Sequence, residues 1–201
     1  MVLRSVDPDR LYTADEFTEL VGSDPSWELI EGKIEPVGAA AWDSSRVTNR
    51  LASYLTFFVE TRGLGFVFVA EASFRLKQNP DSVVQPDVAY VRPHRLDGQT
   101  PGTYFAGTPE LAVEVGSPSD RMAALTRKMT RYLVTGAELT WLVDPQTRQV
   151  HVRRPGEDVA TILRGGDVLS GEDVVPGLAL PLPAIFDVTD PIRPELVLPT
   201  R

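Results

Sequence analysis

The segment of residues 83–132 constrains the fold most, because it predicts two strands followed directly by a helix. The first strand is apolar apart from Asp87, and in the second Glu114 interrupts a run of apolar residues. A helix that follows a strand packs back on the sheet, and this one would carry Lys128 towards the two acids. The segment therefore predicts a sheet that brings two carboxylates and a lysine together.

The remaining residues predict further strands and helices in a mixed order. A helix is expected at residues 14–21, because Thr13 and Glu16 form a capping box before it. The other predicted helices and strands lie at residues 27–30, 31–34, 43–61, 66–76, 83–91, 110–115, 117–135, 139–144, 149–153 and 159–163. This order indicates an α/β (α+β) protein, a mixed β-sheet flanked by helices in one domain over residues 1–201. Residues 1–12 are expected to be a loose lead-in and 191–201 a tail.

Two local signals refine these elements. Pro86 cannot donate to a β-ladder, so the strand at residues 83–91 is expected to be irregular there. Asp43 or Ser44 is expected to cap the helix at 43–61, and Ser117 the helix that follows Glu114.

Charge and composition limit the classes of partner and compartment. The chain has no cysteine, no signal-peptide core and no apolar run long enough for a bilayer, which predicts a cytoplasmic protein. Its formal net charge is −8, whereas affinity for DNA comes mostly from basic surface. Binding to DNA would therefore depend on clustered cations, of which the sequence has two groups: Arg92, His94 and Arg95, and Arg121, Arg127, Lys128 and Arg131.

The two acids and the lysine suggest metal-assisted chemistry. The chain lacks a phosphate-binding glycine loop and a nucleophile elbow, and with only two histidines a histidine-rich metal site is not expected. Mg²⁺ binds one or two carboxylates together with waters and substrate phosphate, which Asp87 and Glu114 could supply. Lys128 would stabilise charge on the phosphorane or orient the attacking water. The alternatives are that both acids form structural ion pairs and that Lys128 is a solvated lysine.

Five motifs in order resemble the Uma2 family of putative endonucleases, within the restriction-endonuclease-like PD-(D/E)xK superfamily. The resemblance covers about residues 13–190. Its motifs are Trp27–Gly32, Val84–Asp87, Val113–Ser119, Lys128-x3-Tyr132-x3-Gly136 and Trp141–Pro145.

The resemblance implies a restriction-endonuclease-like core and a Mg²⁺- or Mn²⁺-dependent DNA endonuclease. Asp87 and Glu114 would be the metal ligands, and Lys128 the catalytic lysine, displaced from its usual place two residues after the glutamate to the following helix. Glu28, Gln85 and Tyr132 would be accessory residues, with Glu28 as an additional acid. The likeness to nucleases that cut duplexes as pairs, together with apolar pieces near the C-terminus that are expected to be exposed, predicts a homodimer.

Two positions depart from the family pattern, and they keep other functions open. Ala124 stands where relatives usually carry an Asp one turn before the lysine, and Asp43-Ser44-Ser45 stands where a His usually opens the long helix. The first change removes an expected partner of Lys128, and the second removes a substrate contact. With the acidic net charge, they favour the alternative of a binding or assembly module on a degenerate nuclease fold. Metal-assisted hydrolysis of a smaller phosphoester is a third hypothesis.

Overall fold

The computed structural model describes residues 6–22, 24–76, 79–117 and 122–197. Its first elements are α1 (Ala14–Val21), β1 (Trp27–Ile30), β2 (Lys33–Pro36), α2 (Trp42–Thr61), β3 (Phe66–Val69), β4 (Phe74–Leu76), β5 (Ser82–Val84), β6 (Val88–Val91), a short 3₁₀ helix (Pro93–Leu96) and β7 (Phe105–Ala106). These are followed by β8 (Leu111–Val115), α3 (Met122–Thr135), β9 (Leu139–Asp144), β10 (Gln149–Arg153), β11 (Thr161–Arg164), β12 (Val168–Ser170), β13 (Ala179–Pro181), α4 (Leu182–Phe186) and a second 3₁₀ helix (Pro194–Leu196). Among these helices, none combines the length and the hydropathy that a membrane span requires.

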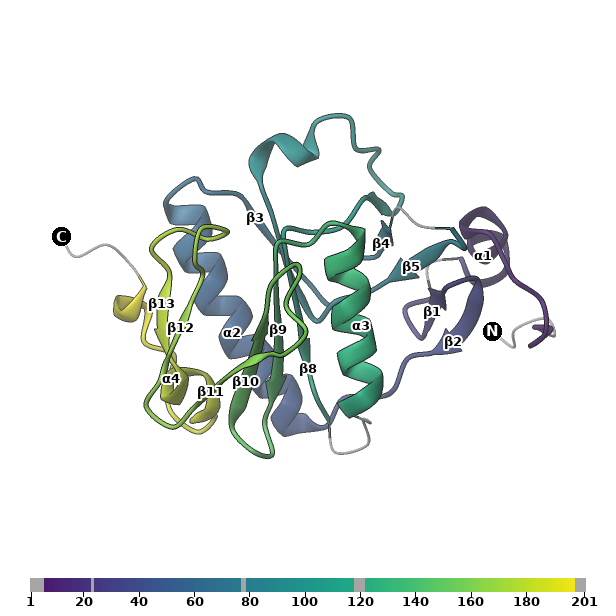
Figure 1. Cartoon of the computed structure of the whole chain (residues 1–201). Coiled ribbons are helices and arrows are strands. Elements are labelled where there is room, and N and C mark those ends of the chain that lie inside the picture. Colours follow the sequence, from purple (N-terminus) through teal and green to yellow (C-terminus); the bar gives the residue numbers. More distant parts are fainter. Residues whose placement is uncertain (1–5, 23, 77–78, 118–121, 198–201) are drawn as a thin grey trace.

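The described strands form two mixed sheets and a small two-stranded one. The larger sheet has the order β11-β10-β9-β8-β6-β3, and only its β8–β9 pair is parallel. The smaller has the order β2-β1-β5-β4-β7, with β4 and β7 parallel, and β12 pairs with β13. Figure 1 shows the larger sheet between α2 on one face and α3 on the other, with the smaller sheet and α1 beyond α3. The predicted mixed α/β class is confirmed.

Two predicted strands are each split between the two sheets. The expected strand at residues 66–76 is wrong, because β3 pairs with β6 in the larger sheet while β4 pairs with β5 in the smaller. The strand at residues 83–91 is irregular at Pro86, as expected, and is broken there into β5 and β6. Asp87 therefore lies where the chain crosses from one sheet to the other.

Helix starts follow local signals only in part. The capping box of α1 is confirmed, since the Glu16 amide donates to Thr13 and the Thr13 amide donates to Glu16. For α2 the predicted cap is wrong: the helix begins at Trp42, and the buried Ser44 hydroxyl instead donates to the Gly116 carbonyl at 2.9 Å. The predicted N-cap of α3 adjoins residues 118–121, which lie outside the described part of the chain.

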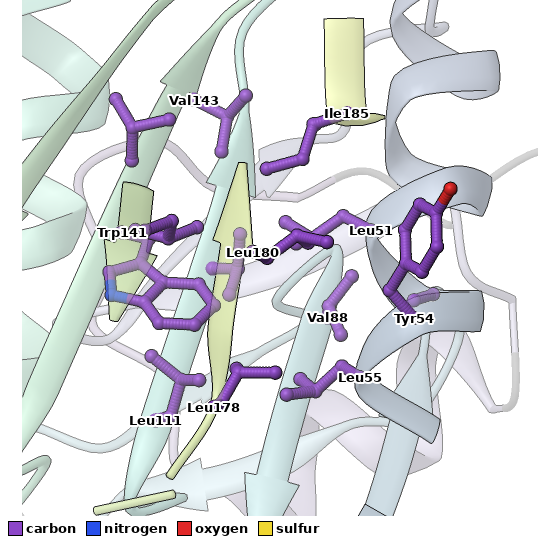
Figure 2. Close-up of a cluster of buried hydrophobic side chains, with 14 of the residues drawn as sticks. Leu51, Tyr54, Leu55, Val88, Leu111, Trp141, Val143, Leu178, Leu180 and Ile185 are labelled. Carbon is purple, nitrogen blue, oxygen red and sulfur yellow. The ribbon is translucent and has the colours of Figure 1, made fainter. Parts of the chain in front are cut away.

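The main core lies between α2 and the larger sheet. Figure 2 shows Leu51 and Leu55 of α2 facing Trp141 of β9, with Leu178 and Leu180 packed beside them. All five side chains are buried. The apolar C-terminal segment therefore belongs to the core. This corrects the expectation that it is exposed and removes one reason for a homodimer, which stays a prediction.

Replacing Trp141 with alanine is expected to lower the free energy of unfolding by about 3–5 kcal/mol, because it leaves a large cavity in a closely packed core. Trp141 is fully buried and belongs to the cluster in Figure 2. Urea denaturation measures the change. Val134→Ala, at a side chain that is 76% exposed, is the matched control and should stay within about 0.5 kcal/mol of the wild type. A loss below about 1 kcal/mol for Trp141→Ala would contradict this description of the core.

Candidate active site

Three elements deliver the predicted residues to the α3 side of the larger sheet. Asp87 immediately precedes β6, and Glu114 lies in β8 beside the parallel strand β9. On β8, Ala112 packs in the cluster that contains Tyr132 of α3, so Glu114, two residues further on, shares that face. Because α3 packs against β8 and β9, Lys128 comes to lie over the same face.

Lys128 connects the two sheets through ion pairs. Its Nζ lies 2.9 Å from Oε1 of Glu114 in the larger sheet and 2.9 Å from Oε1 of Glu28 in the smaller. The lysine side chain is only 16% exposed, so the alternative of a solvated lysine is wrong. Position 124 carries an alanine in place of an acid, but Lys128 is still paired, because Glu28 of β1 and Glu114 of β8 are its partners.

Hydrogen bonds hold the carboxylates in place. The Tyr132 hydroxyl donates to Glu114 Oε1 at 2.7 Å, and the Val115 amide donates to Asp87 Oδ2 at 2.7 Å. Glu28 accepts from the Gln85 amide at 2.6 Å. Since Lys128 and Tyr132 both contact Oε1 of Glu114, neither of these contacts uses its Oε2.

The side chain of Gln85 fixes the chain just before Asp87. Its Nε2 donates to the Trp27 carbonyl at 3.1 Å, which ties the segment between β5 and β6 to β1. Each predicted site residue, catalytic or accessory, therefore lies in one cluster.

Negative charge exceeds positive charge in this cluster. Burial raises the pKa of Glu114 to about 8; the ammonium of Lys128 opposes the rise, and the carboxylates of Asp87 and Glu28 add to it. Burial alone would lower the pKa of Lys128, but Glu114 and Glu28 outweigh it and the pKa lies above its usual value. Burial, followed by the same carboxylates, also raises the pKa of Tyr132 well above its usual value, so its hydroxyl remains a donor.

The cluster opens into a cleft of about 850 Å³. One wall is α3, which contributes Ala124, Arg127, Lys128 and Arg131, and the facing wall includes β1, β2 and residues 36–40. Residues 36–40 had no recognisable signal in the sequence, because a short connection of small and apolar residues has no period that would assign it to a site.

The donor groups suit a hard divalent cation, although they do not form a complete cage. Within the described residues, no group of three or more His, Cys, Asp or Glu side chains is placed to hold a metal ion. Mg²⁺ needs only one or two carboxylates, because waters and substrate phosphate complete its shell. Asp87 and Glu114 both line the cleft, and the excess of carboxylates over cations favours an additional positive charge there.

Comparisons with known proteins give a family match and a fold match for the chain. The model of the Uma2 family, described as a putative restriction endonuclease, matches residues 14–183. A solved structure described as a putative nuclease belonging to DUF820, from Anabaena variabilis, matches with a TM-score of 0.76 and 22% identity, over 88% of this chain and 98% of that chain. At that identity the likeness shows the fold. No curated protein matches the chain.

Proposed function

The chain belongs to the Uma2 family of putative restriction endonucleases, and on that premise we propose that it is a Mg²⁺- or Mn²⁺-dependent endonuclease that hydrolyses phosphodiester bonds in DNA. The observation that supports this most is the convergence of Asp87, Glu114 and Lys128 on one open cleft. The junction before β6, the strand β8 and the helix α3 each supply one of these groups.

In the proposed site, Asp87 and Glu114 would hold the cation. When bound, such an ion polarises the phosphoryl oxygen and lowers the pKa of an attacking water. Asp87 is already oriented by the Val115 amide, and Glu114 by Tyr132. These bonds fix the carboxylates before the substrate arrives, so little reorganisation is needed during the reaction.

Lys128 is the residue proposed to act on the phosphate. Its ammonium is held by Glu28 and Glu114 at the bottom of the cleft, where exposure to water is low. A cation in that position stabilises the charge that develops on the phosphorane more strongly than it would in water. Glu28 acts through Lys128 and is proposed as a positioning residue.

Cleavage of supercoiled plasmid by the purified protein is the direct test. We expect nicked and linear products with Mn²⁺ or Mg²⁺ and none with EDTA, because the cation completes the site. Asp87→Asn preserves the shape of the side chain and should abolish cleavage, which excludes a contaminating nuclease. The proposal fails if the wild type leaves the plasmid intact with either ion, or if folded Asp87→Asn cleaves equally fast.

A binding or assembly module on the nuclease fold is the second candidate. The observation that favours it is that Lys128 already neutralises part of the carboxylate charge, and no complete metal cage exists among the described residues. Calorimetry with Mn²⁺ separates the two functions. The module predicts no binding that depends on Asp87, whereas the endonuclease predicts binding that Asp87→Asn weakens.

A further inference from the structure

The helix α3 differs in charge from the rest of the chain. The whole sequence has 28 acidic and 20 basic residues, yet α3 contains three cations, Arg127, Lys128 and Arg131, and no acid. Ala124 lies one turn before Arg127 and lines the same wall of the cleft. Because residues three or four apart are neighbours on a helix, the absence of an acid leaves this face uniformly basic.

The three cations share the face that lines the cleft. Lys128 is committed to Glu28 and Glu114, but Arg127 is exposed to solvent. Arg131, four residues later, is adjacent to Arg127 on the helix surface. The two arginines therefore extend along the cleft wall from the proposed site of cleavage.

The guanidinium of Arg131 retains capacity for an anion. Its Nη2 lies 3.2 Å from Oε1 of Glu31, whose side chain is 63% exposed. The Arg131 side chain itself is only 12% exposed, and its buried Nε–H has no acceptor within the described part of the chain. An exposed partner of this kind is weakly held. A phosphate group can replace Glu31 as the partner of Nη2, with a charge-assisted hydrogen bond.

The facing wall has the opposite character. It carries Glu31, Lys33 and Glu35 of the β1–β2 hairpin, which together have a net negative charge, followed by the uncharged residues 36–40. A nucleic-acid backbone is repelled by that wall and attracted by α3, so the asymmetry sets the side of the cleft along which the phosphates run.

We infer that Arg127 and Arg131 bind the phosphates next to the scissile one, so that the cleaved strand of DNA lies along α3. The inference rests on the proposed function and names how that site holds its substrate. These contacts involve the backbone only, so they contribute affinity and position without reading sequence.

Salt-dependent binding of a short labelled duplex, measured by fluorescence anisotropy in EDTA, tests the inference. Each lost phosphate contact should reduce the slope of log K against log salt by about 0.9, so Arg127→Gln/Arg131→Gln should reduce it by about 1.8. The affinity of the double variant for two duplexes of unrelated sequence should fall by the same factor. Replacing both arginines with lysine retains the charges and should restore most of the slope. Arg164→Gln, at an exposed arginine of β11 that does not line the cleft, is the matched control and should change nothing.

The outcomes separate this inference from the function on which it rests. If the wild type binds and cleaves DNA but the folded double variant keeps the full slope, the inference is wrong and the proposed function stands. If the wild type neither binds nor cleaves DNA, both fail. If the double variant does not fold, the single variant Arg127→Gln tests the inference, because Arg127 is exposed. The loss of its one phosphate contact should reduce the slope of log K against log salt by about 0.9.

Discussion

Replacing Lys128 with methionine is expected to slow DNA cleavage by about 100- to 1,000-fold, the usual cost of removing one preorganised group that stabilises transition-state charge. Methionine keeps the unbranched apolar stem and removes only the ammonium. The rate of conversion of supercoiled plasmid under single-turnover conditions measures the effect on the chemical step.

The same variant should respond more strongly than the wild type to a divalent ion. Without metal, it leaves Glu28 and Glu114 without their shared cation, which is expected to cost about 3 kcal/mol of stability. Mn²⁺ binds the folded state and would replace the missing charge, so it should raise the melting temperature of the variant more than that of the wild type. The variant would then have a lower cleavage rate but a larger stabilisation by Mn²⁺ than the wild type. A lysine with a merely structural role does not predict this combination.

Lys33→Met is the matched control, because it makes the same change at another lysine that lines the cleft. The Nζ of Lys33 donates to the backbone carbonyls of Pro8 and Arg10 and contacts no carboxylate of the site. Its cleavage rate should stay within a few-fold of the wild type. A rate for Lys128→Met as high as that of Lys33→Met would show that the ammonium has no catalytic part.

Local signals in the sequence were sufficient for several elements. The capping box at Thr13 and the irregularity at Pro86 depend on neighbouring residues only, and the structure confirms both. The splitting of residues 66–76 was not predictable in this way. Their Phe- and Val-rich composition suits any strand, and the break depends on which partner each half finds, β6 or β5.

The sequence located the candidate site better than the cleft around it. A strand followed by a returning helix was enough to predict that Glu114 and Lys128 approach each other, and they do. The cap assigned to Ser44 was wrong, because its hydroxyl bonds to Gly116, which is 72 residues distant in the chain. A contact between residues so far apart in the chain depends on how α2 packs, and no local sequence pattern encodes that packing.

Glu114→Gln is expected to abolish cleavage and, at alkaline pH, to make the metal-free protein more stable than the wild type. The carboxylate is required as a proposed metal ligand, but its charge is unfavourable when the site has no metal. Burial, with Asp87 and Glu28 nearby, raises the pKa of Glu114 from an ordinary value of 4.5 to about 8. Glutamine keeps an oxygen that can accept from Tyr132 and Lys128 without introducing that charge.

The direction of the pH dependence follows from proton binding. Between pH 4.5 and about 8, the folded protein holds the proton on Glu114 while the unfolded chain has released it. The contribution of this group to stability is therefore complete below the unfolded pKa and is lost as the pH rises through the folded pKa. Glutamine does not titrate, so the stability of the variant relative to the wild type should increase with pH over this interval.

Urea denaturation in EDTA at several pH values across that interval measures the difference, and Glu110→Gln provides the control. Glu110 is also buried, next to the other end of β8, but it forms an ion pair with Arg95 and accepts from the Arg92 amide. Its replacement should cost about 2 kcal/mol, because it weakens charged hydrogen bonds. If Glu114→Gln destabilised the protein like Glu110→Gln, with no gain towards alkaline pH, Glu114 would be the satisfied half of a structural ion pair. A gain in stability coupled to lost cleavage is what a carboxylate kept for a metal ion predicts.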